Sequence, residues 1–382
     1  MASNQSSLLT NNKVAQFLGN TSYSIYLWHW PLVFYLNYLE KSNNALWIIG
    51  AIILSVILGW LSYKYIENPS RKFLSNLSLV KGYAVTFIYI TIPVVIFALI
   101  FIKNGVPERL TAEQQNIVKQ ADNKNSLMAK CHISEGLNLP ECRHGNGDVG
   151  LLVLGDSHAM AMMPGVIKAL PDNKSLIEWS YSGCPSVQGI KKSNSPKFQC
   201  AEFIDTILEK KDNYPNTPIL IINRTNTLFH GAPDADPDMV KPLRYIGKPS
   251  LKYDNEYHTK MKNAYVDTLC KFSEGHQVYV TTPIPVYSKN VPKRLAHQSM
   301  LTGKTDWKMP YNEHKKLSMF ANSALAIASK KCGIKVLDTN PYFCDSNYCY
   351  PDKNGIPVYY DDDHLSVFGA QNLTPLFKTI FK

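Results

Sequence analysis

Acidic residues and cysteines are scarce in the first 105 residues of this chain. That part contains two carboxylates, Glu40 and Glu67, against seven lysines and arginines, and it holds none of the eight cysteines, which all follow residue 130. The contrast divides the chain into a membrane region, residues 1–105, and a soluble part that is long enough to bury one large core.

The sequence also lacks a run of basic residues interleaved with aromatic ones. The formal net charge is +10, and the first 105 residues supply half of it, so the soluble part is only mildly basic. Nucleic-acid binding usually requires a concentrated basic patch or stripe. We therefore expect no nucleic-acid partner.

Long apolar stretches occur at residues 23–39, 45–66 and 83–102. About 20 apolar residues cross a bilayer, so the second and third reach spanning length, and the first, which contains His29 and Pro31, is slightly short. The stretches start too late and are too long for a cleavable signal peptide. The sequence thus predicts three transmembrane helices.

The charges beside these stretches predict their orientation. The loop at residues 62–82 is basic, whereas the loop between the first two stretches has only Lys41 beside Glu40. Positive charge marks the cytoplasmic side. We expect the N-terminus and residues 62–82 to be cytoplasmic, and the chain after the third span to lie on the outer, non-cytoplasmic side of the membrane.

An oxidising compartment favours disulfides between the eight cysteines. Proximity along the chain, plus one long pair, predicts Cys131–Cys142, Cys184–Cys200, Cys270–Cys332 and Cys344–Cys349. A zinc site formed by the last pair with His364 is the alternative, but no second cysteine pair has suitable spacing. We predict no metal.

The soluble part alternates short apolar runs with helical segments. Strands are expected near residues 151–154, 175–179, 218–223, 277–282 and 334–337. This alternation predicts an α/β fold with a parallel sheet covered on both faces. We place a linker and lead-in at residues 106–148 and the folded domain at residues 149–382.

Two short motifs stand at opposite ends of this domain. Gly155-Asp156-Ser157-His158 follows an apolar strand and precedes a helical segment, and Asp361 and His364 form an Asp-x-x-His near the C-terminus. A serine on such a turn, with a distant aspartate and histidine, is typical of an activated nucleophile. Ser157 could instead be only a helix N-cap, and the acidic run from Asp361 could bind calcium.

These motifs resemble the blocks of the SGNH (GDSL-like) hydrolase superfamily. Gly183 fits its second block, and Asn223, with Asn226 in reserve, fits the third, although the glycine of the usual Gly-x-Asn-Asp is missing. The resemblance implies a flavodoxin-like three-layer αβα sandwich. It also implies a triad of Ser157, His364 and Asp361, with an oxyanion hole formed by Ser157, Gly183 and Asn223.

The membrane region resembles the last spans of the acyltransferase-3 family. The matching runs are SYSIYLWHWP from Ser22 to Pro31 and YIENPSRK from Tyr65 to Lys72. The family has about ten spans, so the resemblance implies that the missing acyltransferase-3 spans are a partner on a separate polypeptide. It further implies a bacterial inner-membrane location, a periplasmic SGNH domain and acetyl-CoA as the ultimate acyl donor, with no bound cofactor.

Together the two resemblances imply a reaction. We expect an O-acetyltransferase that moves an acetyl group, through an acyl-serine, to a sugar hydroxyl of a cell-envelope polysaccharide such as lipopolysaccharide O-antigen. The alternatives are a membrane-tethered periplasmic carbohydrate acetylesterase, which would use the same residues with water as the acceptor, and a non-catalytic glycan-binding remnant.

Overall fold

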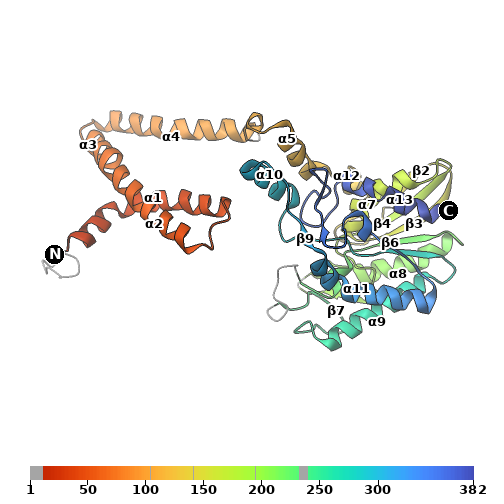
Figure 1. The fold of residues 1–382 in the computed structure, drawn as a ribbon. Helices are drawn as coiled ribbons and strands as arrows, with labels where there is room; N and C mark the ends of the chain where they lie inside the picture. Colours follow the sequence, from red (N-terminus) through yellow and green to blue (C-terminus); the bar gives the residue numbers. More distant parts are fainter. Residues whose placement is uncertain (1–11, 104, 141, 194, 232–239) are drawn as a thin grey trace. The chain divides into compact units, whose positions relative to one another are not determined.

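The computed structural model describes residues 12–382 apart from residues 104, 141, 194 and 232–239. The chain folds as two compact units, Met1–Val106 and Pro107–Lys382 (Figure 1). The N-terminus, which the sequence predicts to be cytoplasmic, lies outside the described residues.

The described part of the first unit consists of helices joined by short turns. Its helices are α1 (Lys13–Tyr38), α2 (Ala45–Ser62), a π-helical turn (Tyr63–Glu67), α3 (Asn68–Ser75) and α4 (Leu79–Ile102). Gly59 lets α2 approach α1, because a Cβ at this position would lie 2.6 Å from Ile25 Cγ1. Glu67 joins the π-helical turn after α2 to α1, since it accepts a 2.6 Å hydrogen bond from Ser24 Oγ.

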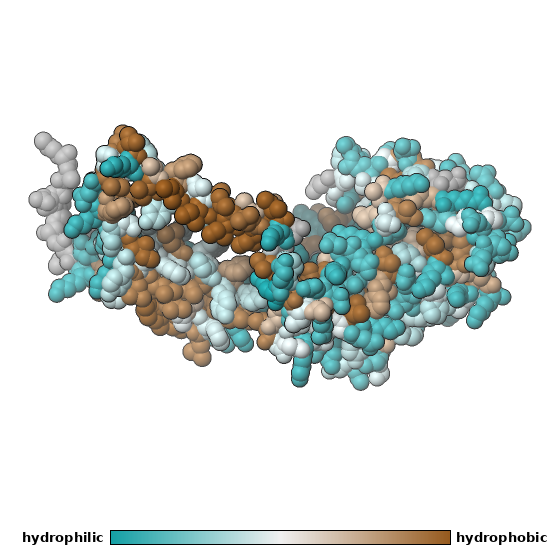
Figure 2. Space-filling model, turned by 90° about the horizontal axis from the view of Figure 1, so that it is seen from above, coloured by the Kyte–Doolittle hydropathy of each residue, from teal (hydrophilic) through white to brown (hydrophobic). Residues whose placement is uncertain are grey.

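Two segments of the first unit, rather than the predicted three, are long and apolar enough to span a membrane. Within the described part of the chain these are Ala45–Ser75 and Leu79–Ile102. The expected span at residues 23–39 lies in α1, whose polar residues, among them Ser24, His29 and Asn37, dilute its apolar character. The prediction of a span at residues 23–39 is therefore wrong, because the composition of α1 is not apolar enough. In the space-filling view, long stretches of this unit are brown, whereas the second unit is mostly teal (Figure 2).

A seven-stranded sheet forms the centre of the second unit. The strand order is β1-β4-β3-β6-β8-β10, and β2 pairs with β4. All neighbours are parallel except β2, which runs antiparallel to β4. The strands are β1 (His132–Ile133), β2 (Cys142–Gly145), β3 (Asp148–Gly155), β4 (Lys174–Tyr181), β6 (Ile219–Ile222), β8 (Val278–Thr281) and β10 (Lys335–Leu337).

Alternating strand residues point into two separate cores. Leu152 and Leu154 belong to one hydrophobic cluster, and Leu151 and Val153 belong to the other. The first is covered by α8 (Cys200–Lys210), α9 (Asn255–Phe272) and α11 (Tyr311–Cys332). The second is covered by α7 (Ser157–Ala169), α10 (Val291–Thr302), α12 (Val367–Asn372) and α13 (Thr374–Phe377). This arrangement confirms the predicted αβα sandwich.

Short elements complete the unit around the sheet. Three small antiparallel pairs lie outside it. They are β5 (Ile190–Lys192) with β7 (Arg244–Ile246), β9 (Met309–Pro310) with β11 (Tyr348–Cys349), and β12 (Asp352–Lys353) with β13 (Ile356–Pro357).

The expected lead-in at residues 106–148 is part of the folded unit. It contains α5 (Ala112–Lys119), α6 (Met128–Cys131) and the strands β1 and β2. Both strands pair with β4, and Ile117 is buried in the second core. The fold therefore begins before residue 149, because these short elements depend on tertiary contacts rather than on a strong local pattern.

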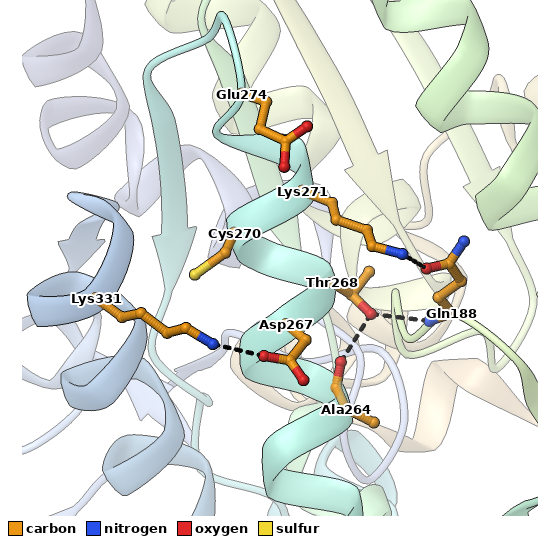
Figure 3. A pocket seen from close by; sticks show the side chains of 8 residues that line it. All are labelled: Gln188, Ala264, Asp267, Thr268, Cys270, Lys271, Glu274 and Lys331. Carbon is orange, nitrogen blue, oxygen red and sulfur yellow. Dashed lines mark hydrogen bonds and ion pairs between the residues drawn. The ribbon is translucent and has the colours of Figure 1, made fainter.

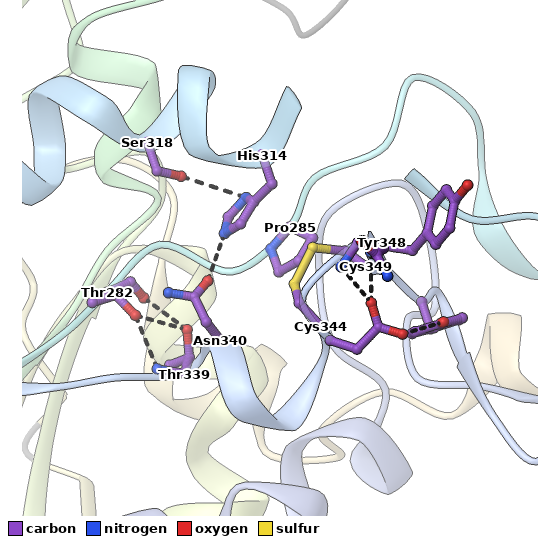
Figure 4. The surroundings of a disulfide bond; sticks show 12 residues. Thr282, Pro285, His314, Ser318, Thr339, Asn340, Cys344, Tyr348 and Cys349 are labelled. Atoms are coloured by element: carbon purple, nitrogen blue, oxygen red, sulfur yellow. Dashed lines mark hydrogen bonds between the residues drawn. A yellow bond between two sulfur atoms is a disulfide. The ribbon is translucent and has the colours of Figure 1, made fainter. Parts of the chain in front are cut away.

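The four disulfides have the predicted pairings. They are Cys131–Cys142, Cys184–Cys200, Cys270–Cys332 and Cys344–Cys349. The last of them closes a short loop near Thr282 and Asn340 (Figure 4). Cys270–Cys332 ties the end of α9 to the end of α11 across 62 residues of chain, the longest of the four loops. A long loop constrains the unfolded chain most, so this disulfide should stabilise the fold more than the others.

Candidate active site

Ser157 is the first residue of α7, directly beyond the end of β3. The turn requires Gly155, because a Cβ there would lie 1.9 Å from the carbonyl oxygen of Ile222 on the neighbouring strand. Asp156 caps the helix by accepting from His158 N at 2.8 Å. Its other oxygen accepts from Arg224 N at 2.8 Å, so the carboxylate also ties the turn to the end of β6.

His364 and Asp361 come to this turn from a loop more than 200 residues later. His364 Nε2 lies 2.8 Å from Ser157 Oγ, and His364 Nδ1 lies 2.9 Å from Asp361 Oδ2. The other oxygen of Asp361 accepts from the backbone N–H groups of Asp363 and His364, which shapes the loop. The structure thus brings together the three side chains that the sequence singled out.

Helix packing holds the two halves of this arrangement together. Helix α12 follows His364 by three residues and packs on α7, which carries Ser157. The helices approach closely at Gly165, where a Cβ would lie 2.1 Å from the carbonyl oxygen of Ala370. A larger residue at position 165 would push apart the helices that set the separation of serine and histidine.

A second carboxylate, from Asp363, also reaches His364. Asp363 Oδ1 lies 3.0 Å from His364 Nδ1, and Oδ2 lies 3.1 Å from His158 Nε2 and 2.6 Å from Arg224 Nη1. Asp363, His158 and Arg224 are not among the site residues that the sequence predicted. No local pattern links these residues, because they lie on three separate segments.

The two carboxylates shift the titration of the imidazole. Burial lowers the pKa of His364, but hydrogen bonds to Asp361 and Asp363 outweigh it and raise the pKa well above the usual value. Burial raises the pKa of Asp363, but its hydrogen bonds to His158 and His364 bring that pKa below the ordinary range. The ring of Tyr360 stacks on His364 with centroids 5.4 Å apart and covers one face of the imidazole.

The candidate oxyanion residues lie at the same edge of the sheet. Gly183 and Asn223 follow β4 and β6, the two strands that flank β3. Gly183 has φ +66°, a conformation that favours glycine, and its carbonyl accepts from Arg244 Nη2 at 2.9 Å. Asn223 Nδ2 donates to the carbonyl of Cys184 at 3.2 Å, so one of its two N–H groups is already engaged.

Asn226, the reserve for the third block, points elsewhere. Its Nδ2 lies 3.5 Å from Ser318 Oγ on α11. Ser318 in turn contacts the buried His314, which lies 2.8 Å from Asn340 Oδ1 (Figure 4). This chain of polar contacts connects Asn226 to helix packing and leaves Asn223 as the residue placed beside the serine turn.

Two groups of possible metal ligands involve the same loop. They are His158, Asp363 and His364, and Asp361, Asp362 and Asp363. In the first group the ligand atoms are hydrogen bonded to one another, and Arg224 already supplies a positive charge to Asp363. A third group includes Cys131, whose sulfur is in a disulfide. The first and the third set therefore do not fit a metal as arranged.

A polar pocket of about 460 Å³ is lined mainly by α9, together with Gln188, Glu274 and Lys331 (Figure 3). Lys271 donates to Gln188, and Lys331 pairs with Asp267 at 2.7 Å. Both lysines are thus engaged, and none of the lining residues belongs to the serine turn.

Comparison with known proteins identifies the second unit. A family profile described as "SGNH domain (fused to AT3 domains)" matches residues 130–379, which is more than half of the chain. The chain belongs to this SGNH family. A second profile, described as an acyltransferase domain, matches residues 1–64. The SGNH assignment and the adjoining acyltransferase-3 match confirm both resemblances drawn from the motifs.

Similar proteins are known for parts of the chain. O-acetyltransferase OatA of Staphylococcus aureus (strain NCTC 8325 / PS 47) is 37% identical over 57 residues, which is 14% of this chain and 10% of that protein. The chain therefore aligns with about a tenth of this curated relative. The lipopolysaccharide acetyltransferase periplasmic domain of Salmonella ser. Paratyphi A matches with a TM-score of 0.50 and 15% identity, over 71% of this chain and 98% of that one. This likeness supports the SGNH fold.

Proposed function

We propose that this protein transfers an acetyl group to a sugar hydroxyl of a cell-envelope polysaccharide, through an acyl-enzyme on Ser157. The observation that carries the proposal is the hydrogen-bonded chain Ser157–His364–Asp361 on a strand-to-helix turn of an SGNH domain. The adjoining acyltransferase match and the O-acetyltransferase relative support acetyl transfer rather than another reaction of this fold.

In the first half-reaction, Ser157 Oγ attacks the carbonyl carbon of the acetyl donor. Its proton passes to His364 Nε2, 2.8 Å away, and Asp361 stabilises the imidazolium through Nδ1. The leaving group departs with that proton. In the second half-reaction, the acceptor hydroxyl gives its proton to His364 and attacks the acyl carbon, and Ser157 Oγ leaves and regains the proton.

The tetrahedral intermediates need hydrogen-bond donors for the negative oxygen. The backbone N–H groups of Ser157 and Gly183, with the remaining N–H of Asn223 Nδ2, are our candidates. The N-terminus of α7 adds the positive end of a helix dipole at the same place. Loss of one such donor typically slows turnover about 10²–10³-fold.

The rest of the proposal concerns the setting of the reaction. The two apolar segments anchor the protein in the bacterial inner membrane, and the four disulfides favour a periplasmic location for the SGNH domain. Acetyl-CoA is the ultimate donor on the cytoplasmic side. Acyltransferase-3 spans on a separate polypeptide pass the acetyl group across the membrane to Ser157.

The test compares cells that produce the wild-type chain with cells that produce Ser157→Ala. Glycan from each strain is released and its O-acetyl content measured by mass spectrometry. Acetylation that depends on Ser157 is the expected result. Higher acetylation in the Ser157→Ala strain would instead assign hydrolysis of glycan acetyl esters, and equal acetylation in both strains would refute an acyl-enzyme on Ser157.

A further inference from the structure

We infer that Asp363 is a second positioning carboxylate, which shares the Nδ1 proton of His364 with Asp361 and is itself held in place by His158 and Arg224. This inference rests on the proposed function, since it concerns how His364 is prepared to activate Ser157. Asp363 would act through His364 rather than on the substrate.

The distances from His364 do not rank one carboxylate above the other. Nδ1 lies 2.9 Å from Asp361 Oδ2 and 3.0 Å from Asp363 Oδ1. One N–H can be shared between two acceptors at such distances, so the proton has two partners. Replacement of either carboxylate would leave the other within hydrogen-bond reach.

The two carboxylates lie at nearly equal distances from His364 Nδ1, but their exposure to solvent differs. The Asp363 side chain is 4% exposed, against 27% for Asp361. Solvent and salt screen an exposed charge more than a buried one. Asp361 also uses its other oxygen to order the backbone of its own loop. We therefore assign the larger electrostatic effect on the imidazole to Asp363 and the larger effect on loop shape to Asp361.

His158 and Arg224 explain how Asp363 stays ionised and oriented while buried. A buried carboxylate is costly unless it is paired and hydrogen bonded. His158, beside the serine on α7, and Arg224, beyond the end of β6, both contact Oδ2 and leave Oδ1 for His364. Three segments thus meet at one carboxylate. Arg224 directly follows Asn223, where the usual third block has an aspartate, and it supplies the charge that Asp363 needs.

Other titratable groups also act on this cluster. Tyr360 stacks on His364, and the rings of His158 and His364 lie 5.1 Å apart. Asp362 is the remaining carboxylate of the loop, and its pKa is raised by burial and by Asp363. The groups that face His364 are Asp361, Asp363, Tyr360, His158, His132 and, through Asp363, Arg224.

Asp362 provides a matched control, because Asp362→Asn removes the same charge one residue away. The full chain in detergent is treated with a fluorophosphonate, and the phosphonylation of Ser157 is followed by intact mass from pH 5 to pH 10. Hydrolysis of an aryl acetate is measured in parallel. The variants are Asp363→Asn, Asp361→Asn, the double variant, Asp362→Asn and Arg224→Gln.

We expect Asp363→Asn to react about 10²-fold more slowly at the plateau of the profile, and the double variant about 10⁴-fold more slowly, the loss seen when a lone triad aspartate becomes asparagine. The acidic limb of the Asp363→Asn profile should move to lower pH by about one unit, because a nearby negative charge is lost. Asp362→Asn should keep the wild-type rate within about twofold, since among the described contacts of His364 no hydrogen bond or ion pair comes from the Asp362 side chain.

Arg224→Gln keeps the inference testable if Asp363→Asn does not fold. It removes the cation that offsets the charge of Asp363, so the acidic limb should move to higher pH, opposite to the shift for Asp363→Asn. A purely structural role for Asp363 would slow both variants equally at every pH without moving the limb, and that result would overturn the inference. So would an Asp363→Asn profile identical to that of Asp362→Asn.

These outcomes are separable from failure of the proposed function. A wild-type chain that is phosphonylated at Ser157 but acetylates no glycan would refute acetyl transfer, while the comparison of Asp363 with Asp362 would still decide the inference. A wild-type chain that is not phosphonylated at Ser157 would overturn both.

Discussion

The two units of this protein differ in how far their large apolar side chains are exposed. In the first unit Trp30 is 69% exposed and Phe101 is 74% exposed, whereas in the second unit Trp179 and Phe203 are almost fully buried. Soluble proteins rarely expose large contiguous apolar patches. The difference shows that each unit is built for its own solvent, hydrocarbon for the helices of the first and water for the sandwich of the second.

The two units also differ in how their ionisable residues are arranged. The first unit holds Glu67 against Ser24 and Arg71. The second unit gathers several charges at one edge of its sheet, where Asp361, Asp363 and Arg224 surround His364. The chemistry is therefore expected in the second unit and the anchoring in the first, and each can be perturbed separately.

The substitution with the largest expected effect tests whether catalysis depends on the second unit while membrane anchoring does not. His364→Gln removes the proton acceptor for Ser157 and should lower the rate of aryl acetate hydrolysis by about 10⁴-fold or more, the scale of triad losses. The amount of chain recovered in the membrane fraction should not change. A variant that kept more than a tenth of the wild-type rate would contradict the assignment of His364.

Removal of the longest disulfide should affect the second unit alone. Cys270→Ser with Cys332→Ser opens a loop of 62 residues and should lower the free energy of unfolding by about 4 kcal/mol. Denaturation followed by near-ultraviolet circular dichroism measures the loss. The matched pair is Cys344→Ser with Cys349→Ser, which opens a loop of only 5 residues and should cost about half as much.

A packing change in the first unit should lower the stability of that unit without changing the activity of the second. Gly59→Leu places atoms where Ile25 lies and should destabilise the contact between α1 and α2 by about 1–3 kcal/mol. Gly50→Leu on the same helix is the control, because a Cβ there meets nothing within 4 Å. Thermal aggregation in detergent measures the difference, and aryl acetate hydrolysis should be the same in both variants. Equal thermal stability of the two variants would contradict the close approach at Gly59.

The smallest expected effect is a displaced pH profile. Because both carboxylates raise the pKa of His364, the neutral ring that accepts the serine proton is reached only at higher pH. The acidic limb of kcat/KM should therefore lie above about pH 6.5, the ordinary value for histidine. An acidic limb below that pH would contradict the shift.

Stability should depend on pH in the opposite sense. A raised folded-state pKa means that protonated His364 stabilises the second unit fully below its unfolded value, and that this contribution is lost as the pH rises through the folded value. Thermal unfolding of wild-type and His364→Gln chains across this window measures the contribution. A difference between the two that stayed constant with pH would contradict the coupling.

The sequence predicted those features that have strong local signals. The strand before Ser157, the motifs at Asp156 and Asp361, and the cysteine neighbours were enough for the sandwich, the three convergent side chains and the disulfides. The contacts of Asp363 with His158 and Arg224 could not be predicted, because they join three distant segments and follow no spacing rule. The span at residues 23–39 was wrongly predicted because aromatic residues such as Trp28 and Trp30 masked the polar character of α1.

The packing of α12 and α13 on α7 also has a consequence for biosynthesis. The nucleophile is synthesised 207 residues before its histidine, and the helices that press the two together follow that histidine in the sequence. A chain synthesised only as far as residue 363 should therefore carry an inert serine. Reactivity is expected only once His364 has been made and α12 and α13 have docked on α7.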